Sequence, residues 1–261
     1  SPQVVRIHLT DLQESPIDWE KLEKGIHGEQ ARISSRSLKP HQQIALDLTH
    51  EHFKTESRGK LIMACGTGKT YTSLRIAENE TKGKGVVLFL VPSIALLGQT
   101  LREWTTFSQE PIHPICICSD PEITRKKTKN EEGMGYSVVD LALPASTNVK
   151  DIVNQFKSIK NKTGMTVVFS TYQSIEVISK VQHELKNEIP ELESFDLTIC
   201  DESHRTTGVT LSGDDESAFT KVHDDDFLKS KKRIYMTATP RLYSDETKSK
   251  AAQNEALLCS M

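Results

Sequence analysis

The chain has 261 residues, of which 36% are hydrophobic and 26% are charged. This composition is typical of a globular protein and excludes a disordered chain, and no apolar run reaches the roughly 18–20 residues of a membrane-spanning helix. The net charge of −3 excludes a global basic field, so any nucleic-acid binding must rest on local residues.

The five cysteines, an odd number on a long chain, predict reduced thiols in a cytoplasmic compartment rather than a disulfide framework. Cys116 and Cys118 form a C-x-C pair with only His113 nearby, and no second pair lies at zinc-ligand spacing. We therefore interpret both as core residues. The N-terminal segment lacks the apolar stretch of a signal peptide, and no membrane partner is expected.

Apolar runs alternate with amphipathic segments along the chain. The expected strands are residues 60–64, 86–91, 112–118, 165–170, 195–200 and 233–238. The expected helices are residues 70–82, 93–107 and 150–161. Several of the runs are apolar nearly throughout, as in strands buried on both faces. The alternation predicts an α/β fold with a mostly parallel sheet, right-handed crossovers and helices on both faces, which is a three-layer αβα arrangement.

Three segments differ from this pattern. The polar residues 1–35 predict an N-terminal arm, followed by one α/β domain over residues 36–261. Residues 119–147, which include RKKTKNEEGMG, hold too few apolar residues for a core element and predict an exposed insertion. Residues 207–231 carry two acidic clusters, and we expect a short helix there.

The segment MACGTGKT, residues 63–70, directly follows the first expected strand. Gly66 and Gly68 allow backbone N–H groups to curl around phosphate oxygens, and the next helix adds its positive end to the anion site. Lys69 can reach the β- and γ-phosphates, and the Thr70 hydroxyl can ligate Mg²⁺. Methionine replaces the first glycine of the usual G-x-x-x-x-G-K-[ST] pattern. For the loop alone, a glycine-rich turn that binds nothing is the alternative.

Asp201 and Glu202 follow an apolar strand at its carboxyl end, where ligands bind in parallel sheets. Asp201 can hold Mg²⁺ opposite Thr70, and Glu202 can orient and deprotonate an attacking water. An exposed acidic turn is the alternative, but the phosphate loop upstream favours a functional interpretation. Thr237 and Thr239 end the last strand and can relay hydrogen bonds, although alone they indicate only a strand exit marked by proline.

In this order, MACGTGKT, DESH and MTATPRLY resemble motifs I, II and III of superfamily 2 helicases and translocases, the DEAD/DEAH-box proteins. LKPHQ (38–42) resembles their adenine-reading motif, FLVPSIALLGQT (89–100) resembles motif Ia, and FSTYQS (169–174) resembles a later DNA-contacting motif. The resemblance covers residues 38–243 and looks closest to the motor subunits of type I and type ISP restriction–modification enzymes. It implies the first RecA-like domain of a P-loop NTPase.

The resemblance implies a role for each matching residue. The catalytic residues would be Lys69, Asp201 and Glu202, and the metal ligands Thr70 and Asp201. ATP would be held by Gln42, Gly66, Thr67, Gly68, Lys69 and Thr70, with Gln42 on the base. His204 would couple the nucleotide site to Thr237 and Thr239. The backbone of the nucleic-acid track would be touched by Ser93, Gln99, Thr171 and Tyr172. For the Tyr172 ring, a place in the core is the favoured alternative.

The resemblance also implies ATP and Mg²⁺ as cofactors and DNA, contacted through its backbone, as the track. A second RecA-like domain, with its arginine for the γ-phosphate, and nuclease or methyltransferase modules are expected outside this chain, because only 21 residues follow Pro240. ATP hydrolysis by this part alone should then be weak. An RNA track, another P-loop phosphotransferase and a scaffold without hydrolysis are the alternatives. A basic run is more typical of a solvated loop than of a phosphate contact: Arg125, Lys126, Lys127 and Lys129.

Overall fold

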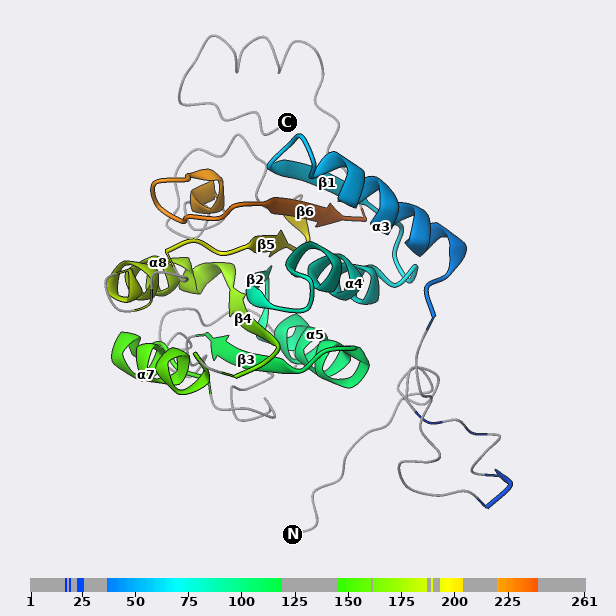
Figure 1. Ribbon diagram of the computed structural model, residues 1–261, viewed down its shortest axis with the longest axis horizontal. Coiled ribbons are helices and arrows are strands. Elements are labelled where there is room, and N and C mark those ends of the chain that lie inside the picture. The colour runs from blue at the N-terminus through cyan, green and yellow to red at the C-terminus, as the bar shows by residue number, and fades with distance from the viewer. Residues whose placement is uncertain are drawn as a thin grey trace, which may run out of the picture. The chain divides into compact units, whose positions relative to one another are not determined.

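A computed structural model of the protein describes residues 37–118, 145–160, 162–186, 189, 193–203 and 220–238, together with residues 17, 19 and 23–25 (Figure 1). The chain divides into two compact units, Ser1–Lys39 and Pro40–Met261. All strands and helices named below belong to the second unit. The division into an arm over residues 1–35 and a domain over residues 36–261 stays a prediction.

Six parallel strands form one sheet. They are β1 (Arg58–Ile62), β2 (Gly85–Val91), β3 (Ile112–Ile117), β4 (Met165–Thr171), β5 (Leu197–Cys200) and β6 (Arg233–Thr237). Their order across the sheet is β1-β6-β5-β2-β4-β3, and every neighbouring pair is parallel. The carboxyl ends of β1, β6 and β5 therefore lie next to one another at the same end of the sheet.

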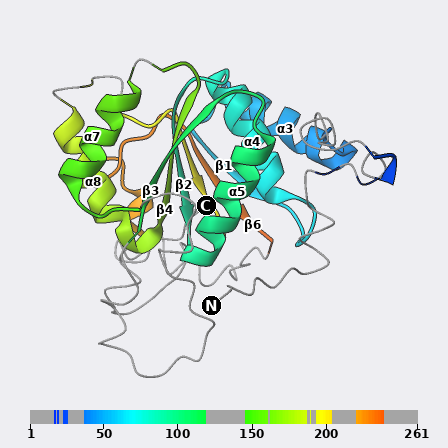
Figure 2. The same ribbon diagram turned by 90° about the horizontal axis from the view of Figure 1, so that it is seen from below.

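Helices cover both faces of the sheet. They are α3 (Pro40–His52), α4 (Lys69–Thr81), α5 (Ile94–Phe107), α7 (Val149–Ile159) and α8 (Ile175–Leu185). Figure 2 shows α3, α4 and α5 on one face and α7 and α8 on the other. From β1 to β3 the chain crosses the sheet in one direction and then returns, and right-handed crossovers therefore place the later helices on the opposite face. The predicted three-layer α/β fold is confirmed.

Strand β2 shows why the central strands are apolar throughout. Val86, Leu88 and Leu90 pack into a core cluster with residues of α7 and α8. Phe89 points to the other face, where its ring meets that of Trp104 from α5 at 5.2 Å in an edge-on arrangement. Each such fully buried side chain stabilises the fold by about 1.5–3 kcal/mol. Both faces of the strand are thus covered, as the sequence predicted.

Three element predictions differ from the structure. Strand β1 spans residues 58–62 rather than 60–64, because the chain turns into the glycine loop after Ile62. Helix α3 was not predicted, since it buries only Gln42 and leaves Ile44 and Leu48 exposed, so it has no apolar stripe. Helix α8 was also missed, although its buried apolar residues recur at helical spacing: Ile175, Ile178, Val181 and Leu185.

Parts of two predicted segments can be compared with the structure. Ala145 bridges to Cys116 of β3, and the Ser146 N–H donates to the Cys116 carbonyl at 3.2 Å. Residues 119–144, the rest of the predicted insertion, lie outside the described residues, as do residues 207–219. The described part of the acidic segment contains one 3₁₀ turn, Lys221–His223. Among the described helices, none has the length and apolar character to cross a bilayer.

Candidate nucleotide site

The loop between β1 and α4 has the shape of a phosphate-binding turn. The Met63 N–H donates to the Thr237 carbonyl at 3.1 Å, which anchors the start of the loop to β6. Gly66 and Gly68 have φ angles of 74° and 83°, in the left-handed region that glycine occupies without strain. A Cβ atom on Gly68 would also collide with the Gln42 side-chain amide. The backbone angle therefore favours glycine at position 68, and a larger residue would also displace the Gln42 amide from the loop.

Helix α4 begins directly at this loop, with Lys69 and Thr70 in its first turn. Gly68, the N-cap residue, has no side chain that could bond the first N–H groups, so these groups and the helix dipole are available to an anion. The Lys69 ammonium lies 3.5 Å from the Met63 carbonyl, across the loop. Loop, helix end and ammonium together form an anion-binding arrangement.

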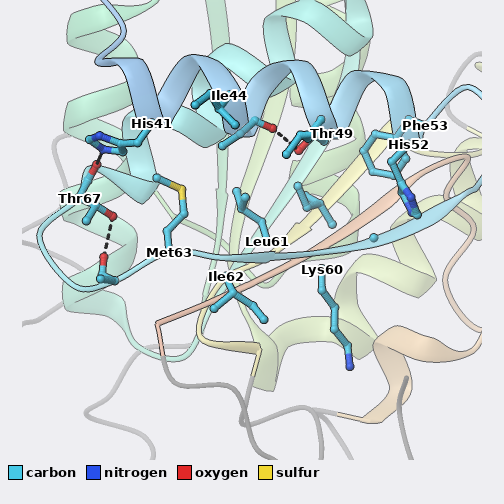
Figure 3. Close-up of a pocket in the computed structure, with 15 residues that line it drawn as sticks. His41, Ile44, Thr49, His52, Phe53, Lys60, Leu61, Ile62, Met63 and Thr67 are labelled. Carbon is cyan, nitrogen blue, oxygen red and sulfur yellow. Dashed lines mark hydrogen bonds between the residues drawn. The ribbon is translucent and has the colours of Figure 1, made fainter.

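Gln42 of α3 supports the loop from behind. Its side chain is 1% exposed, and Nε2 donates to the carbonyls of Thr67 at 3.0 Å and Gly68 at 3.5 Å. The His41 Nε2 lies 3.1 Å from the same Thr67 carbonyl, and the Thr67 hydroxyl donates back to the Ala64 carbonyl at 2.7 Å (Figure 3). Gln42 thus contacts the loop itself. Its predicted contact with the adenine base stays a prediction.

A groove of about 620 Å³ runs between α3 and β1 and ends at this loop (Figure 3). Leu61 and Met63 point from β1 toward α3, whereas Lys60 and Ile62 point to the other side of the strand (Figure 3). The groove is mostly apolar, with His41 and Thr67 at its loop end. Its shape and lining suit a flat, partly apolar ring next to the phosphate loop.

Asp201 lies at the tip of β5, two strands away from the loop. Its N–H donates to the Leu90 carbonyl of β2 at 2.9 Å, and its side chain is 7% exposed. Burial raises the pKa of the carboxyl to about 6, while the Glu202 N–H and the Lys69 ammonium lower it. The phosphate loop follows β1 and Asp201 follows β5, and both strands flank β6, so the loop and the acidic tip lie at the carboxyl ends of nearby strands.

Glu202 adopts a strained backbone conformation. Its φ angle is 49°, the left-handed region that costs a non-glycine residue on the order of 1 kcal/mol. Its N–H donates to Oδ1 of Asp201 at 2.9 Å, which orients the neighbouring carboxylate. Strain of this kind gathers at functional sites, where the surrounding structure maintains it.

Strand β6 separates the loop from the acidic tip, and Thr237 ends it. Thr237 is 6% exposed, and its carbonyl is the one that holds Met63. The structure thus brings Thr237 between Lys69 and Asp201 along the strand ends. His204, which was predicted to couple the nucleotide site to Thr237 and Thr239, lies outside the described residues, as does Thr239.

The residues predicted to touch a nucleic-acid backbone lie farther along the carboxyl ends of the strands, at β2 and β4. Val91 pairs with Thr171, so Ser93 and Thr171 come from adjacent strand ends. Ser93 caps α5 and accepts from the Leu96 N–H at 3.4 Å, Gln99 is exposed on α5, and Thr171 is 5% exposed. Tyr172 has no exposed surface, so its ring lies in the core, as the alternative interpretation had it. The run from Arg125 to Lys129 lies outside the described residues.

Sequence reasoning missed Trp104 of α5. Its buried indole N–H donates to the Thr70 carbonyl in the first turn of α4 at 3.1 Å. Its ring also packs edge-on against Phe89 and Phe169, with centroids 5.2 and 5.7 Å away. The residue therefore fixes the helix end that presents Thr70. No motif or spacing in the sequence indicates this contact, because it joins two different helices.

The buried Asp201 carboxyl predicts a pH-dependent stability in metal-free solution. Its pKa lies above the ordinary 3.8, so the folded state holds the proton more tightly, and ionisation above pH 6 costs about 3 kcal/mol. We expect Asp201→Asn to raise the free energy of unfolding at pH 8 by up to about 3 kcal/mol, and the gain to shrink below about 1 kcal/mol near pH 4. Urea unfolding with EDTA at both pH values measures this.

The exposed Asp47 of α3 offers a matched control, because Asp47→Asn makes the same chemical change at the surface. The control should alter the free energy of unfolding by less than about 0.5 kcal/mol. A gain for Asp201→Asn that stays constant between pH 4 and pH 8 would contradict the burial of its charge.

Comparisons with known proteins agree with this geometry. Residues 35–242 match the family described as "Type III restriction enzyme, res subunit". A probable helicase of African swine fever virus (isolate Pig/Kenya/KEN-50/1950) is 29% identical over 203 residues, which are 77% of this chain and 19% of the viral protein.

Two solved structures are also similar. The ATP-dependent Type ISP restriction-modification enzyme LlaBIII bound to DNA is 40% identical, with a TM-score of 0.72 over 90% of this chain and 15% of that one. A nuclease-deletion mutant of the Type ISP enzyme LlaGI in complex with a DNA substrate mimic is 42% identical, with a TM-score of 0.62 over 80% of this chain and 18% of that one. The chain spans less than a fifth of the length of these relatives.

Proposed function

This chain belongs to the family of the type III restriction enzyme res subunit, and from this premise we propose that it is the ATP-binding first motor domain of a DNA-dependent helicase or translocase in a restriction–modification system. The observation that carries the proposal is the topology of the strand ends: β1, which leads into the phosphate loop, and β5, which ends at Asp201, lie on either side of β6, and the Met63 N–H bonds the Thr237 carbonyl at the end of β6. The two Type ISP enzymes described above, at 40% and 42% identity, are restriction–modification enzymes whose structures contain DNA or a DNA substrate mimic.

Nucleotide binding follows from the loop. The N–H groups after Gly66 and Gly68 and the ammonium of Lys69 hold the phosphates, while the groove that ends at His41 and Thr67 receives the base. Thr67 belongs to both the loop and the lining of the groove, and Gln42 bonds its carbonyl, so a base in the groove and phosphates in the loop would lie next to each other.

The acidic tip fits a divalent cation. An ionised carboxylate that is 7% exposed carries an unfavourable desolvation cost, as its raised pKa shows, and a bound cation offsets that cost. Asp201 and the Thr70 hydroxyl would hold Mg²⁺, which neutralises charge on the phosphates when bound. Glu202, directly next to Asp201, is placed to orient a water molecule and take its proton.

The track would run along the edge formed by the ends of β2 and β4. Ser93 and Gln99 carry hydroxyl and amide groups at the surface, which suit contacts to sugar and phosphate without reading sequence, whereas the Thr171 side chain is buried beside them. The proposal includes a second RecA-like domain and nuclease or methyltransferase modules elsewhere in the parent protein, since this chain spans only 15% of the LlaBIII chain. A cytoplasmic location is part of the proposal, on the basis of the odd number of cysteines in the sequence.

Calorimetric titration tests the proposal. The chain should bind ATP with Mg²⁺ more tightly than ATP with EDTA, and the full-length protein that carries it should hydrolyse ATP faster when duplex DNA is added. Stimulation by RNA of equal length but not by DNA would identify RNA as the track. Phosphate transfer to a small acceptor with no effect of nucleic acid would overturn the proposal.

A further inference from the structure

We propose that Tyr172 is a positioning residue for the metal and water site, in that its hydroxyl fixes the peptide between Asp201 and Glu202. The inference rests on the proposed function, since it concerns the same site. The resemblance implied a track contact for Tyr172, with a core position favoured for its ring, and the ring is fully buried while its hydroxyl donates to the Asp201 carbonyl at 2.8 Å.

Tyr172 reaches this carbonyl from another part of the sheet. It begins a single 3₁₀ turn, Tyr172–Ser174, that follows β4. Strand β2 lies between β4 and β5, so the side chain spans the end of β2 to reach the residue after β5. Leu90 at the end of β2 accepts the Asp201 N–H at 2.9 Å. The backbone of Asp201 is therefore held at its N–H by Leu90 and at its carbonyl by Tyr172.

The hydrogen bond from Tyr172 to the Asp201 carbonyl also affects the N–H of the same peptide, which belongs to Glu202. A peptide is planar, so fixing its oxygen also fixes the direction of its N–H. Here the N–H belongs to Glu202 and donates to Oδ1 of Asp201 at 2.9 Å. The Tyr172 hydroxyl thus sets the orientation of the Asp201 carboxylate through one rigid unit.

The same peptide leads into the strained residue. Glu202 has a φ angle of 49°, a conformation that needs support from its surroundings. Without the Tyr172 hydroxyl, the Asp201 carbonyl would lose a buried donor and the peptide would be free to rotate toward a relaxed conformation. Rotation would turn the Glu202 N–H away from the Asp201 carboxylate, and the metal ligand would lose its alignment.

Tyr172→Phe keeps the ring and removes only the hydroxyl. ATP affinity is measured by calorimetry with Mg²⁺ and with EDTA, and the ratio of the two is the quantity of interest. We expect the variant to lower this ratio about tenfold, with ATP affinity in EDTA unchanged, because only the Mg²⁺ contribution passes through Asp201.

Tyr235→Phe is the matched control. Tyr235 is 8% exposed, and its hydroxyl lies 3.0 Å from Nδ1 of His223, so the control removes a buried tyrosine hydroxyl that bonds elsewhere. It should leave the ratio at the wild-type value. A wild-type ratio in Tyr172→Phe would overturn the inference while leaving the proposed function intact. Failure of the wild-type chain to bind ATP with Mg²⁺ would instead defeat the proposed function.

A measurement on the wild-type protein covers the case in which Tyr172→Phe does not fold. In an NMR spectrum of protein labelled at the tyrosine rings, addition of ATP and Mg²⁺ should shift the Tyr172 resonances more than addition of ATP with EDTA does. The Tyr235 resonances serve as the internal reference. Equal shifts for Tyr172 under the two conditions would overturn the inference.

Discussion

Lys69→Ala is expected to weaken the binding of ATP with Mg²⁺ by about 100-fold or more. The Lys69 ammonium lies across the phosphate loop, 3.5 Å from the Met63 carbonyl, and its charge lowers the pKa of Asp201, so we expect it to bind the phosphates directly. A charge-assisted hydrogen bond contributes about 1.5–3 kcal/mol, and a lysine that meets two phosphate groups contributes on the order of twice that. Titration calorimetry of the wild type and the variant measures the loss.

Lys84→Ala supplies the control for this change. Lys84 is exposed just before β2, at the opposite end of the sheet from the strand tips. Removal of its charge alters the net charge of the chain equally but should leave the affinity within about twofold of the wild type. Equal affinities for Lys69→Ala and the wild type would show that the phosphates bind elsewhere.

Much of the fold was predictable because its signals are local. Strand β2 is apolar on both faces, which is how a central parallel strand appears in a sequence, and the glycine loop marks the passage from β1 to α4. Helix α3 was not predictable on the same grounds, because Ile44 and Leu48 remain exposed and the helix is held by polar contacts such as that of Gln42. Its apolar residues therefore do not mark a buried face.

The residues of the candidate site were predictable from the sequence, but the contacts that hold them were not. The residue types of the phosphate loop and of the acidic tip follow from their chemistry, and parallel strands bring them to one edge. The contacts that hold them could not be predicted, because Tyr172 to Asp201 and Trp104 to Thr70 join residues that are distant in sequence. A motif indicates which groups react, whereas the packing around it decides which buried side chain orients them.

Glu202→Gln is expected to slow ATP hydrolysis while leaving ATP binding nearly unchanged. The amide keeps the size of the side chain but cannot accept a proton from water, and loss of a general base lowers a rate by about 10²–10⁴-fold. We expect the variant to bind ATP with Mg²⁺ within about twofold of the wild type, because Asp201 and Lys69 are unchanged. Single-turnover hydrolysis by the full-length protein with DNA measures the rate.

Glu184→Gln makes the same replacement on the exposed face of α8 and should leave both binding and turnover unchanged. Glu202 differs from Glu184 in its surroundings, since it is held at a φ angle of 49° next to a buried carboxylate. We therefore expect only the Glu202 variant to lose activity. If the Glu202 variant hydrolysed ATP at the wild-type rate, another group would have to take the proton, and the strain at the strand tip would then serve only to orient Asp201.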